Sequence, residues 1–101
     1  MKVFYTGRRY RTKANGEYNV ETGILTVQKG SIVSDQIACF RSTSKIKKLR
    51  DEYVDENGVL LEDLSFTTPS SAASFVAGYS VDGYRAWHVQ EHVTLKTALK
   101  K

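Results

Sequence analysis

The segment FTTPSSAASFVAGYSVDG, residues 66–83, decides the fold of this chain. It holds no charge until its last two residues, whereas 26% of the whole chain is charged. Thr68 suits a helix N-cap, and Pro69 suits the first helical position because the N–H it lacks has no helical partner there. Gly78 offers a left-handed helix end. The segment therefore predicts a helix over 69–78. Its apolar positions recur at helical spacing and are expected to be buried at the centre of the fold: Ala72, Phe75, Val76 and Tyr79.

The first thirty residues alternate between apolar and polar residues, as a β-meander does. Strand-like runs cover residues 3–5, 9–12, 17–20 and 24–28. Between two of these runs, Asn15-Gly16 is typical of a type I′ hairpin turn, because both residues tolerate positive φ. We therefore expect antiparallel strands joined by short turns.

Two further helices and one strand are predicted. Ser42 to Ser44 can cap a helix over 44–57, which Asn57-Gly58 would end, with its apolar face at Ile46, Leu49 and Tyr53. Thr94 can cap a helix over 94–100, with Leu95, Ala98 and Leu99 inward. Between them YRAWHV, residues 84–89, alternates like a strand, and its Trp87 is expected in the core. The expected fold is α+β: one small domain over 1–101, with a mostly antiparallel sheet built from the N-terminal meander and the Trp87 strand, packed with two or three short helices.

Composition limits the class of protein. A chain of 101 residues with 41% hydrophobic content is sufficient for one core. The sequence has no apolar run long enough to span a bilayer, and its start turns basic where a signal peptide would continue apolar. We therefore expect a cytoplasmic protein without a membrane partner. The single Cys39 predicts neither an internal disulfide nor a zinc site.

Charge is distributed unevenly along the chain. Residues 1–50 hold eleven basic and three acidic residues, a net charge of +8, whereas residues 51–101 hold eight acidic and four basic residues, a net charge of −4. In the predicted helix over 44–57 the lysines come first and the acids last, opposite to what the helix dipole favours. This arrangement predicts either a surface that attracts polyanions or a charge-paired surface helix.

Catalytic motifs are incomplete. HVQEH, residues 88–92, matches the pattern H-x-x-E-H of inverted zinc proteases, but that pattern requires a helix, and this segment overlaps a predicted strand. Ser42 to Lys45 match S-x-x-K without its companion motifs. The sequence shows neither a phosphate-binding glycine loop nor a G-x-S-x-G motif. We therefore expect no catalytic residue, no metal, no cofactor and no enzyme activity, with an exposed His92 and a partly buried His88.

Basic residues alternate with tyrosines near the N-terminus, a pattern that suits phosphate contacts and base stacking. The alternative is that the tyrosines belong to the core and the arginines only solubilise the surface. The function favoured is non-catalytic nucleic-acid binding, most naturally of DNA. Its candidate residues are Arg8, Arg9, Arg11, Lys13, Lys47 and Lys48 for the backbone, and Ser70, Ser71, Tyr84 and Arg85 for recognition. The alternative function is a protein-interaction module that uses exposed apolar residues at Val59, Leu60 and Leu61.

Several segments together resemble the domain of unknown function 4357 family: ILTVQKGS, KIKKLRDEYVDENGVL, FTTPSSAASFVAGYSVDGYRAWHV and TLKTAL. The chain departs from the family pattern at Thr68, Ser71 and Asp82, and at QEHVTL, residues 90–95. Members resemble C-terminal modules of GIY-YIG nuclease and restriction-linked proteins, and the core is similar to the RAMA domain that accompanies adenine methylases. The resemblance implies an accessory module that binds DNA or senses modified DNA, with a nuclease or methylase as a possible partner.

Overall fold

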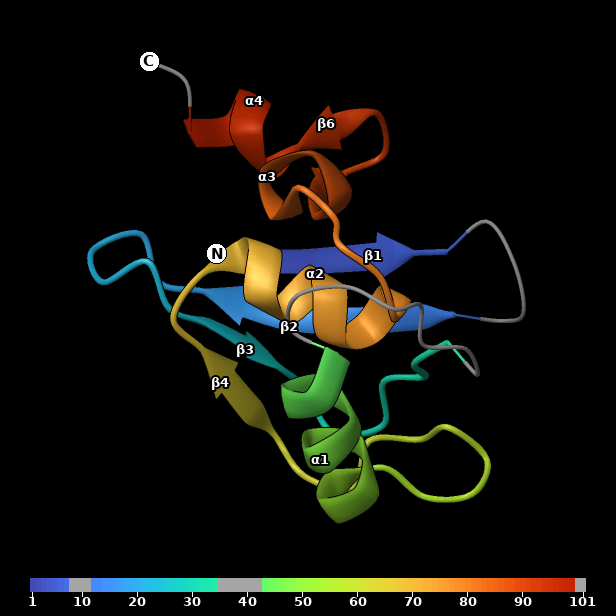
Figure 1. Ribbon diagram of the computed structural model, residues 1–101. Helices are drawn as coiled ribbons and strands as arrows, with labels where there is room; N and C mark the ends of the chain where they lie inside the picture. The colour runs from blue at the N-terminus through green and yellow to red at the C-terminus, as the bar shows by residue number, and fades with distance from the viewer. Residues whose placement is uncertain (8–11, 35–42, 100–101) are drawn as a thin grey trace.

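The structure is a computed structural model that describes residues 1–7, 12–34 and 43–99. In this part of the chain, six strands form one antiparallel sheet in the order β4-β3-β2-β1-β5-β6 (Figure 1). The strands are β1 (Lys2–Thr6), β2 (Lys13–Tyr18), β3 (Leu25–Val27), β4 (Leu64–Phe66), β5 (His88–Gln90) and β6 (Val93–Thr94). The helices are α1 (Thr43–Tyr53), α2 (Pro69–Ala77), α3 (Gly83–Ala86) and α4 (Leu95–Leu99). The predicted α+β class with an antiparallel sheet is confirmed.

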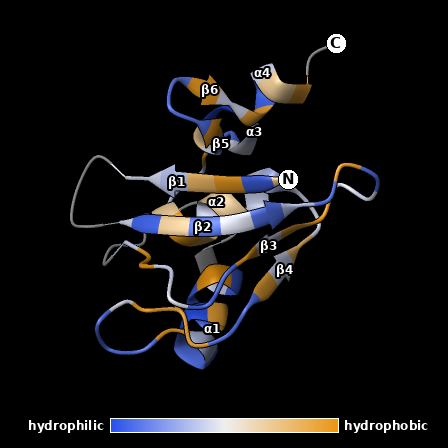
Figure 2. Cartoon of the chain, turned by 180° about the vertical axis from the view of Figure 1, so that it is seen from behind, coloured by the Kyte–Doolittle hydropathy of each residue, from blue (hydrophilic) through white to orange (hydrophobic). Residues whose placement is uncertain are grey.

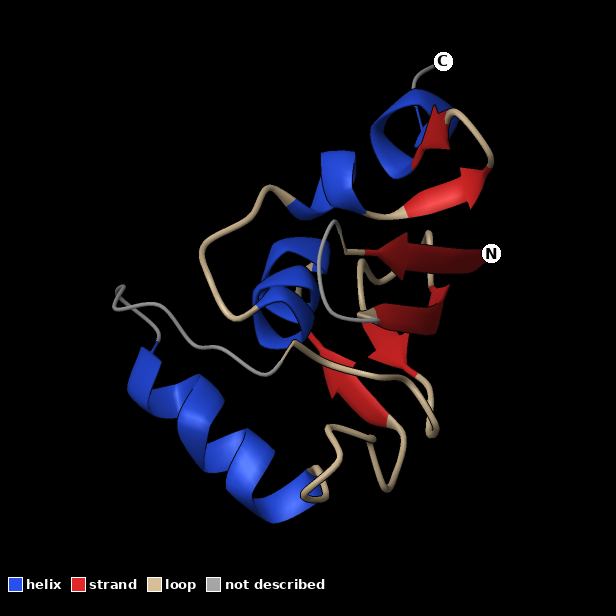
Figure 3. Cartoon of the chain, turned by 90° about the vertical axis from the view of Figure 1, so that its right-hand side faces the viewer, coloured by secondary structure: helices blue, strands red, loops and turns tan. Residues whose placement is uncertain are grey.

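The central strands have one buried and one exposed face. Val3 and Tyr5 of β1 and Ala14 of β2 are buried, while the residues that alternate with them are mostly exposed. Helix α2 lies against the buried face (Figures 1 and 3), where it contributes the fully buried Phe75 and Val76 to the core. Figure 2 looks at the sheet from the other side, with β1 and β2 in front of α2.

Helix α2 forms as its sequence predicts. The Thr68 hydroxyl oxygen accepts a hydrogen bond from the Ser71 amide, and Gly78 ends the helix at φ 84° while its own amide donates to the Ser74 carbonyl. The predicted burial of Tyr79 is wrong, because 52% of this residue is exposed. Tyr79 follows the left-handed glycine, so the helical spacing that would have turned it inward no longer applies.

The predicted turn at Asn15-Gly16 is wrong, because both residues lie inside β2. A Cβ atom at Gly16 would lie 2.9 Å from the Thr26 carbonyl oxygen of β3, so the glycine permits close strand packing instead of a turn. The turn between β2 and β3 lies at 19–24, where Gly23 has φ 78°. The predicted strands at 3–5 and 24–28 are confirmed, and the one at 17–20 ends at Tyr18. Most of the one at 9–12 falls outside the described residues.

The predicted strand YRAWHV is partly wrong. Gly83–Ala86 form one helical turn, and the strand begins only at His88. The Asp82 carboxylate starts this turn by accepting a hydrogen bond from the Tyr84 amide at 3.1 Å. Trp87 is fully buried, as predicted, and its indole Nε1 donates to the Pro69 carbonyl at 3.0 Å. The tryptophan therefore attaches the chain after α3 to the start of α2 and does not itself belong to a strand.

Helix α1 is shorter than the predicted 44–57. The helix ends at Tyr53, and Val54 then pairs with Leu60. The chain therefore turns back between these two residues, and Gly58, whose φ is 82°, lies within this turn. The Asp55 carboxylate holds this turn by accepting hydrogen bonds from the amides of Asn57 and Val59. The glycine therefore serves the turn and does not end the helix.

Two further predictions of side-chain exposure are wrong. Leu60 is fully buried, because it pairs with Val54 and belongs to the core, so the apolar surface predicted at 59–61 lacks its central residue. Leu61 is exposed, as predicted, and Val59 is half-buried. In α4, Thr94 caps the helix, Leu95 is buried and Leu99 packs against the core, as predicted, but Ala98 is exposed, because the two leucines, one turn apart, make the inward contacts. Among the described residues, no helix is long and apolar enough to cross a membrane. Cys39 lies outside the described residues.

Candidate functional site

The uncovered face of the sheet is the candidate site. Side chains directly opposite each other in an antiparallel pair point to the same face, and the register of β1 with β2 places Lys2 opposite Glu17 and Thr6 opposite Lys13. Between these pairs, Phe4 lies opposite Asn15. Among the side chains that these two strands place on this face, Phe4 alone is apolar. The strands therefore present a polar surface with one aromatic ring in it.

A second aromatic ring, that of His88, lies beside Phe4 on the neighbouring strand. The register of β1 with β5 places His88 opposite Phe4, and the two rings stack with their centroids 5.7 Å apart and their planes 25° apart. His88 Nδ1 lies 3.0 Å from the Ala86 carbonyl oxygen, which can only accept, so Nδ1 carries the proton of this hydrogen bond. This contact fixes the orientation of the imidazole. Both rings are half-buried, so part of each remains accessible.

A depression of about 410 Å³ adjoins these rings. It is lined by Phe4, Thr6, His88, Glu91 and His92. Glu91 and His92 form the turn between β5 and β6, where His92 adopts φ 66°. Their side chains are 89% and 90% exposed, with Nε2 of the histidine 3.6 Å from Oε1 of the glutamate. The depression thus has an aromatic base and a polar, solvent-exposed wall.

The predicted phosphate-contacting residues lie in three different parts of the chain. Lys13 is exposed at the start of β2, on the uncovered face. Lys47 and Lys48 are exposed on α1. The remaining three, Arg8, Arg9 and Arg11, lie outside the described residues. Their place in the sequence is between Gly7 and Thr12, which are joined by a hydrogen bond from the Gly7 amide to the Thr12 carbonyl at 2.9 Å.

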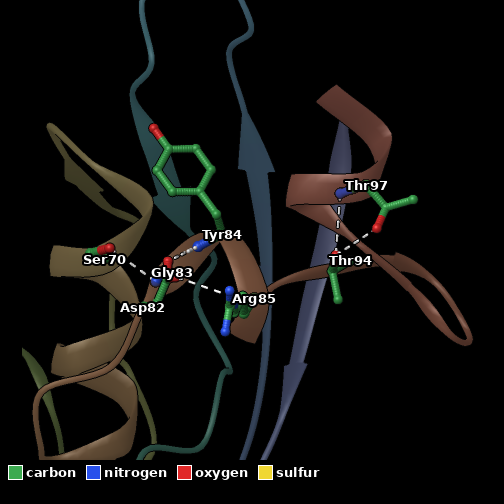
Figure 4. A network of polar contacts seen from close by, with 7 residues as sticks. All are labelled: Ser70, Asp82, Gly83, Tyr84, Arg85, Thr94 and Thr97. Atoms are coloured by element: carbon green, nitrogen blue, oxygen red, sulfur yellow. Dashed lines mark hydrogen bonds and ion pairs between the residues drawn. The ribbon is translucent and has the colours of Figure 1, made fainter. Parts of the chain in front are cut away.

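Three of the predicted recognition residues, Ser70, Tyr84 and Arg85, come from the first turn of α2 and from α3, which lies beside it (Figure 4). The Ser70 hydroxyl accepts a hydrogen bond from the Gly83 amide at 2.9 Å. The backbone of Gly83 lies so close that a Cβ atom there would come within 2.1 Å of the Pro69 carbonyl carbon. Arg85 is exposed on α3, with its Nε 3.7 Å from the Asp82 carboxylate, whereas Tyr84 is 38% exposed and lies close to Tyr18. Helix α3 therefore covers this end of α2 on the side of Ser70.

Ser71 differs from Ser70 in its surroundings. Its side chain is exposed, and its hydroxyl oxygen accepts a hydrogen bond from the Thr68 hydroxyl at 3.0 Å. Its amide donates to the same Thr68 oxygen at 3.1 Å. Both serines thus take part in the cap of α2, and Ser71 also remains open to solvent.

Two tyrosine pairs show how these groups are arranged along the sheet. Burial, with Tyr79 close by, raises the pKa of Tyr5 to about 12. At the other end of β2, burial, with Tyr84 close by, also raises the pKa of Tyr18. Tyr5 pairs with Ala14, which is next to Lys13. Tyr79, which follows α2, therefore lies at the Lys13 end of β2, and Tyr84 of α3 lies at the Tyr18 end. Because β2 has six residues, roughly 3.3 Å each, these ends are about 17–20 Å apart.

The candidate residues therefore form two groups and not one site. Arg50 of α1 donates to the Phe75 and Val76 carbonyls in the last turn of α2, so Lys47 and Lys48 lie near the Lys13 end of β2 but on the side of the sheet that α2 covers (Figure 3). The group around Ser70, Tyr84 and Arg85 lies at the other end.

The residues that line the depression were not predicted as a site. A signal was present in the sequence: in KVFYT, residues 2–6, Phe4 alternates with Lys2 and Thr6, which places an aromatic ring on a polar face. The expectations of a partly buried His88 and an exposed His92 are confirmed. The segment HVQEH runs through a strand and a turn, and in the described part of the chain no group of three or more His, Cys, Asp or Glu residues is placed to hold a metal ion.

Comparison with known proteins identifies the family. The model of the family described as Domain of unknown function (DUF4357) matches residues 4–99, a range that includes the sheet except for the first two residues of β1, all four described helices and the depression. The curated proteins and the solved structures gave no match. Since the family model covers nearly the whole chain, this protein belongs to the DUF4357 family.

Proposed function

We propose that this domain binds nucleic acid, DNA above all, through the uncovered face of its sheet, without catalysing a reaction. The observation that carries the proposal is the exposed Lys13 on the same face as the accessible Phe4–His88 pair. A cation attracts phosphate, and an aromatic ring offers a stacking surface to any base. A surface with both groups suits a nucleic acid better than a small anion or an apolar peptide.

Charge around this face adds to the proposal. Arg8, Arg9 and Arg11 come just before Lys13 in a half-chain of net charge +8. Guanidinium groups suit bidentate phosphate contacts. The face also carries Glu17, whose carboxylate lies 3.0 Å from the Met1 ammonium, so that its repulsion of phosphate is partly offset. The proposal therefore assigns backbone contacts on this face to these arginines and Lys13. Lys47 and Lys48, also proposed as phosphate contacts, lie on α1, on the same side of the sheet as α2 (Figure 3).

The second group of candidate residues lies on the other side of the sheet, because Ser70 belongs to α2, which covers the buried face (Figure 3). The proposal assigns a recognition role to Ser70, Ser71, Tyr84 and Arg85 in this second group. A nucleic acid that runs along β2 on the uncovered face does not reach this second group, so the recognition role is a separate part of the proposal.

The test is a fluorescence anisotropy titration of labelled single-stranded and double-stranded DNA and RNA, first at low salt and then at increasing salt. The logarithm of the binding constant is expected to fall linearly with the logarithm of the salt concentration, by about 0.9 per phosphate contact for duplex DNA. Arg9→Ala/Arg11→Ala and Lys13→Ala should weaken binding and flatten this slope. Lys96→Ala, which removes an exposed lysine from α4, is the matched control. Absence of binding to every oligonucleotide at low salt would refute the proposal.

The resemblance to nuclease-linked and methylase-linked modules extends the proposal to the protein's setting. On this basis the domain acts in the cytoplasm, beside a nuclease or a methylase whose DNA contacts it supplements. Co-purification of such an enzyme with the tagged domain after nuclease treatment tests this extension. The same pulldown, combined with failure to bind oligonucleotides, favours a protein-interaction module instead.

A further inference from the structure

We infer that the depression beside Phe4 and His88 holds one unpaired base of a single-stranded nucleic acid. This inference rests on the proposed function and names its substrate class. It concerns a part of the uncovered face that the basic residues do not occupy: the base and wall formed by β1, β5 and the turn between β5 and β6.

The size and lining of the depression fit a planar ring. Its volume of about 410 Å³ lies within the usual range for small-molecule sites. Phe4 and His88 are nearly parallel, 25° apart, and each is half-buried, so they form a fixed aromatic base with accessible surface. The hydrogen bond from His88 Nδ1 to the Ala86 carbonyl holds the imidazole in place before any ligand arrives. A base can therefore stack here without first ordering the two rings.

The wall indicates which bases suit the depression. An ionised carboxylate only accepts hydrogen bonds, and Glu91 lines the depression with its side chain 89% exposed. The exocyclic amino groups of cytosine and adenine can donate to it, whereas thymine has a carbonyl oxygen in that position and would have to turn its N3–H toward the carboxylate. Thr6 offers a hydroxyl that can donate or accept. The site therefore favours amino-bearing bases over thymine.

The position of the depression indicates a single strand. In a duplex both faces of each base are covered by neighbouring base pairs, so an aromatic side chain can stack on a base only after that base has left the stack. Phe4 and His88 lie on the face of two strands, beside the exposed turn at Glu91 and His92. From there their short side chains cannot reach into a groove of a DNA duplex. Single strands present their bases at no such cost.

The first experiment compares the protein with two variants on labelled oligodeoxycytidine, its abasic analogue and a duplex of matched length, by anisotropy at one low salt concentration. Phe4→Leu retains apolar volume but removes the ring, and should lower the affinity for oligodeoxycytidine by roughly 5- to 100-fold. Phe4→Trp should retain the affinity. Tyr79→Leu is the matched control, because it removes an exposed aromatic ring outside the depression. Thermal unfolding of each variant establishes that it is folded.

The second experiment compares oligodeoxycytidine with oligodeoxythymidine. The protein should prefer cytosine, and Glu91→Ala should reduce that preference by about tenfold. Repetition with the corresponding RNA distinguishes the two kinds of single strand.

Failure of the inference differs from failure of the proposed function. If salt-dependent binding persists but is equal for single strands, duplexes and abasic strands, and Phe4→Leu changes nothing, the depression is not a base site although the domain binds nucleic acid. If the wild-type protein binds no oligonucleotide at low salt, both proposals fall.

Discussion

Replacement of Arg50 by alanine is expected to destabilise the domain strongly. This side chain crosses from α1 to the last turn of α2. Its Nη2 donates to the Phe75 carbonyl at 2.7 Å and to the Val76 carbonyl at 3.1 Å, and its Nη1 donates to the Ser34 carbonyl at 2.7 Å. The residue is only 9% exposed, and its guanidinium carbon lies 5.9 Å from the centre of the Phe75 ring. The guanidinium thus satisfies carbonyls that the helix end leaves without helical partners.

The magnitude follows from these contacts. A buried carbonyl that loses its donor costs about 1–3 kcal/mol. The carbonyls of Phe75 and Ser34 lose the guanidinium donors here, whereas the Val76 carbonyl keeps the Ser34 amide at 2.8 Å. Water entering the space of the side chain recovers part of that cost. We therefore expect a loss of about 3–5 kcal/mol, a large part of the 5–15 kcal/mol that stabilise a typical domain. For a chain of this length the melting temperature should fall by about 12–20 °C.

Urea unfolding followed by the fluorescence of Trp87 measures this loss, because the buried tryptophan is the single one in the chain. Lys48→Ala is the matched control: it removes an exposed cation from the same helix and should change stability by less than about 0.5 kcal/mol. Arg50→Met retains most of the aliphatic stem and separates packing from hydrogen bonding. If Arg50→Ala and Lys48→Ala have equal stability, the capping role assigned to the guanidinium is wrong.

Two other predictions concern α3 and Tyr5. Gly83→Ala should prevent α3 from packing on α2 and cost more than about 3 kcal/mol, because its Cβ would overlap the Pro69 carbonyl. Gly23→Ala, in an open turn at φ 78°, should cost about 1–2 kcal/mol by the same urea assay, and equal losses would contradict the close contact. The raised pKa of Tyr5, about 12, means that the folded state keeps a proton that an unfolded tyrosine gives up near pH 10. The contribution of Tyr5 to stability is therefore complete below about pH 10 and is lost as the pH rises toward 12. The unfolding free energy of Tyr5→Phe should decline less over this range. An unchanged decline would contradict the pKa shift.

Local signals in the sequence predicted the elements that depend on neighbouring residues. Helix α2 begins at Pro69 after a Thr68 cap and ends at Gly78, because cap, proline and glycine act within one helical turn. Strands β1 and β3 follow from alternation, which depends on the two faces of each strand. These elements, with the uneven charge of the two halves, were sufficient for the α+β class and for the proposal of a nucleic-acid ligand.

Long-range contacts decided the rest. Gly16 reads locally as a turn residue, but the approach of the Thr26 backbone makes it a strand residue, and Gly83 begins a helical turn because it packs on Pro69. Arg50 is one of several basic residues in the sequence, and only the return of Phe75 and Val76 to α1 gives it a structural role.

The candidate site divides in the same way. The sequence was sufficient to identify Lys13 and the arginines before it as cations, since charge is a property of each residue. Phe4 and His88 are 84 positions apart, and only the pairing of β1 with β5 brings their rings together beside Glu91. The sequence by itself therefore determined which residues carry charge and, through the residues at each end, where α2 begins and ends. Strand pairing determined which side chains share a surface, because residues so distant in sequence meet only when the strands of the sheet have paired.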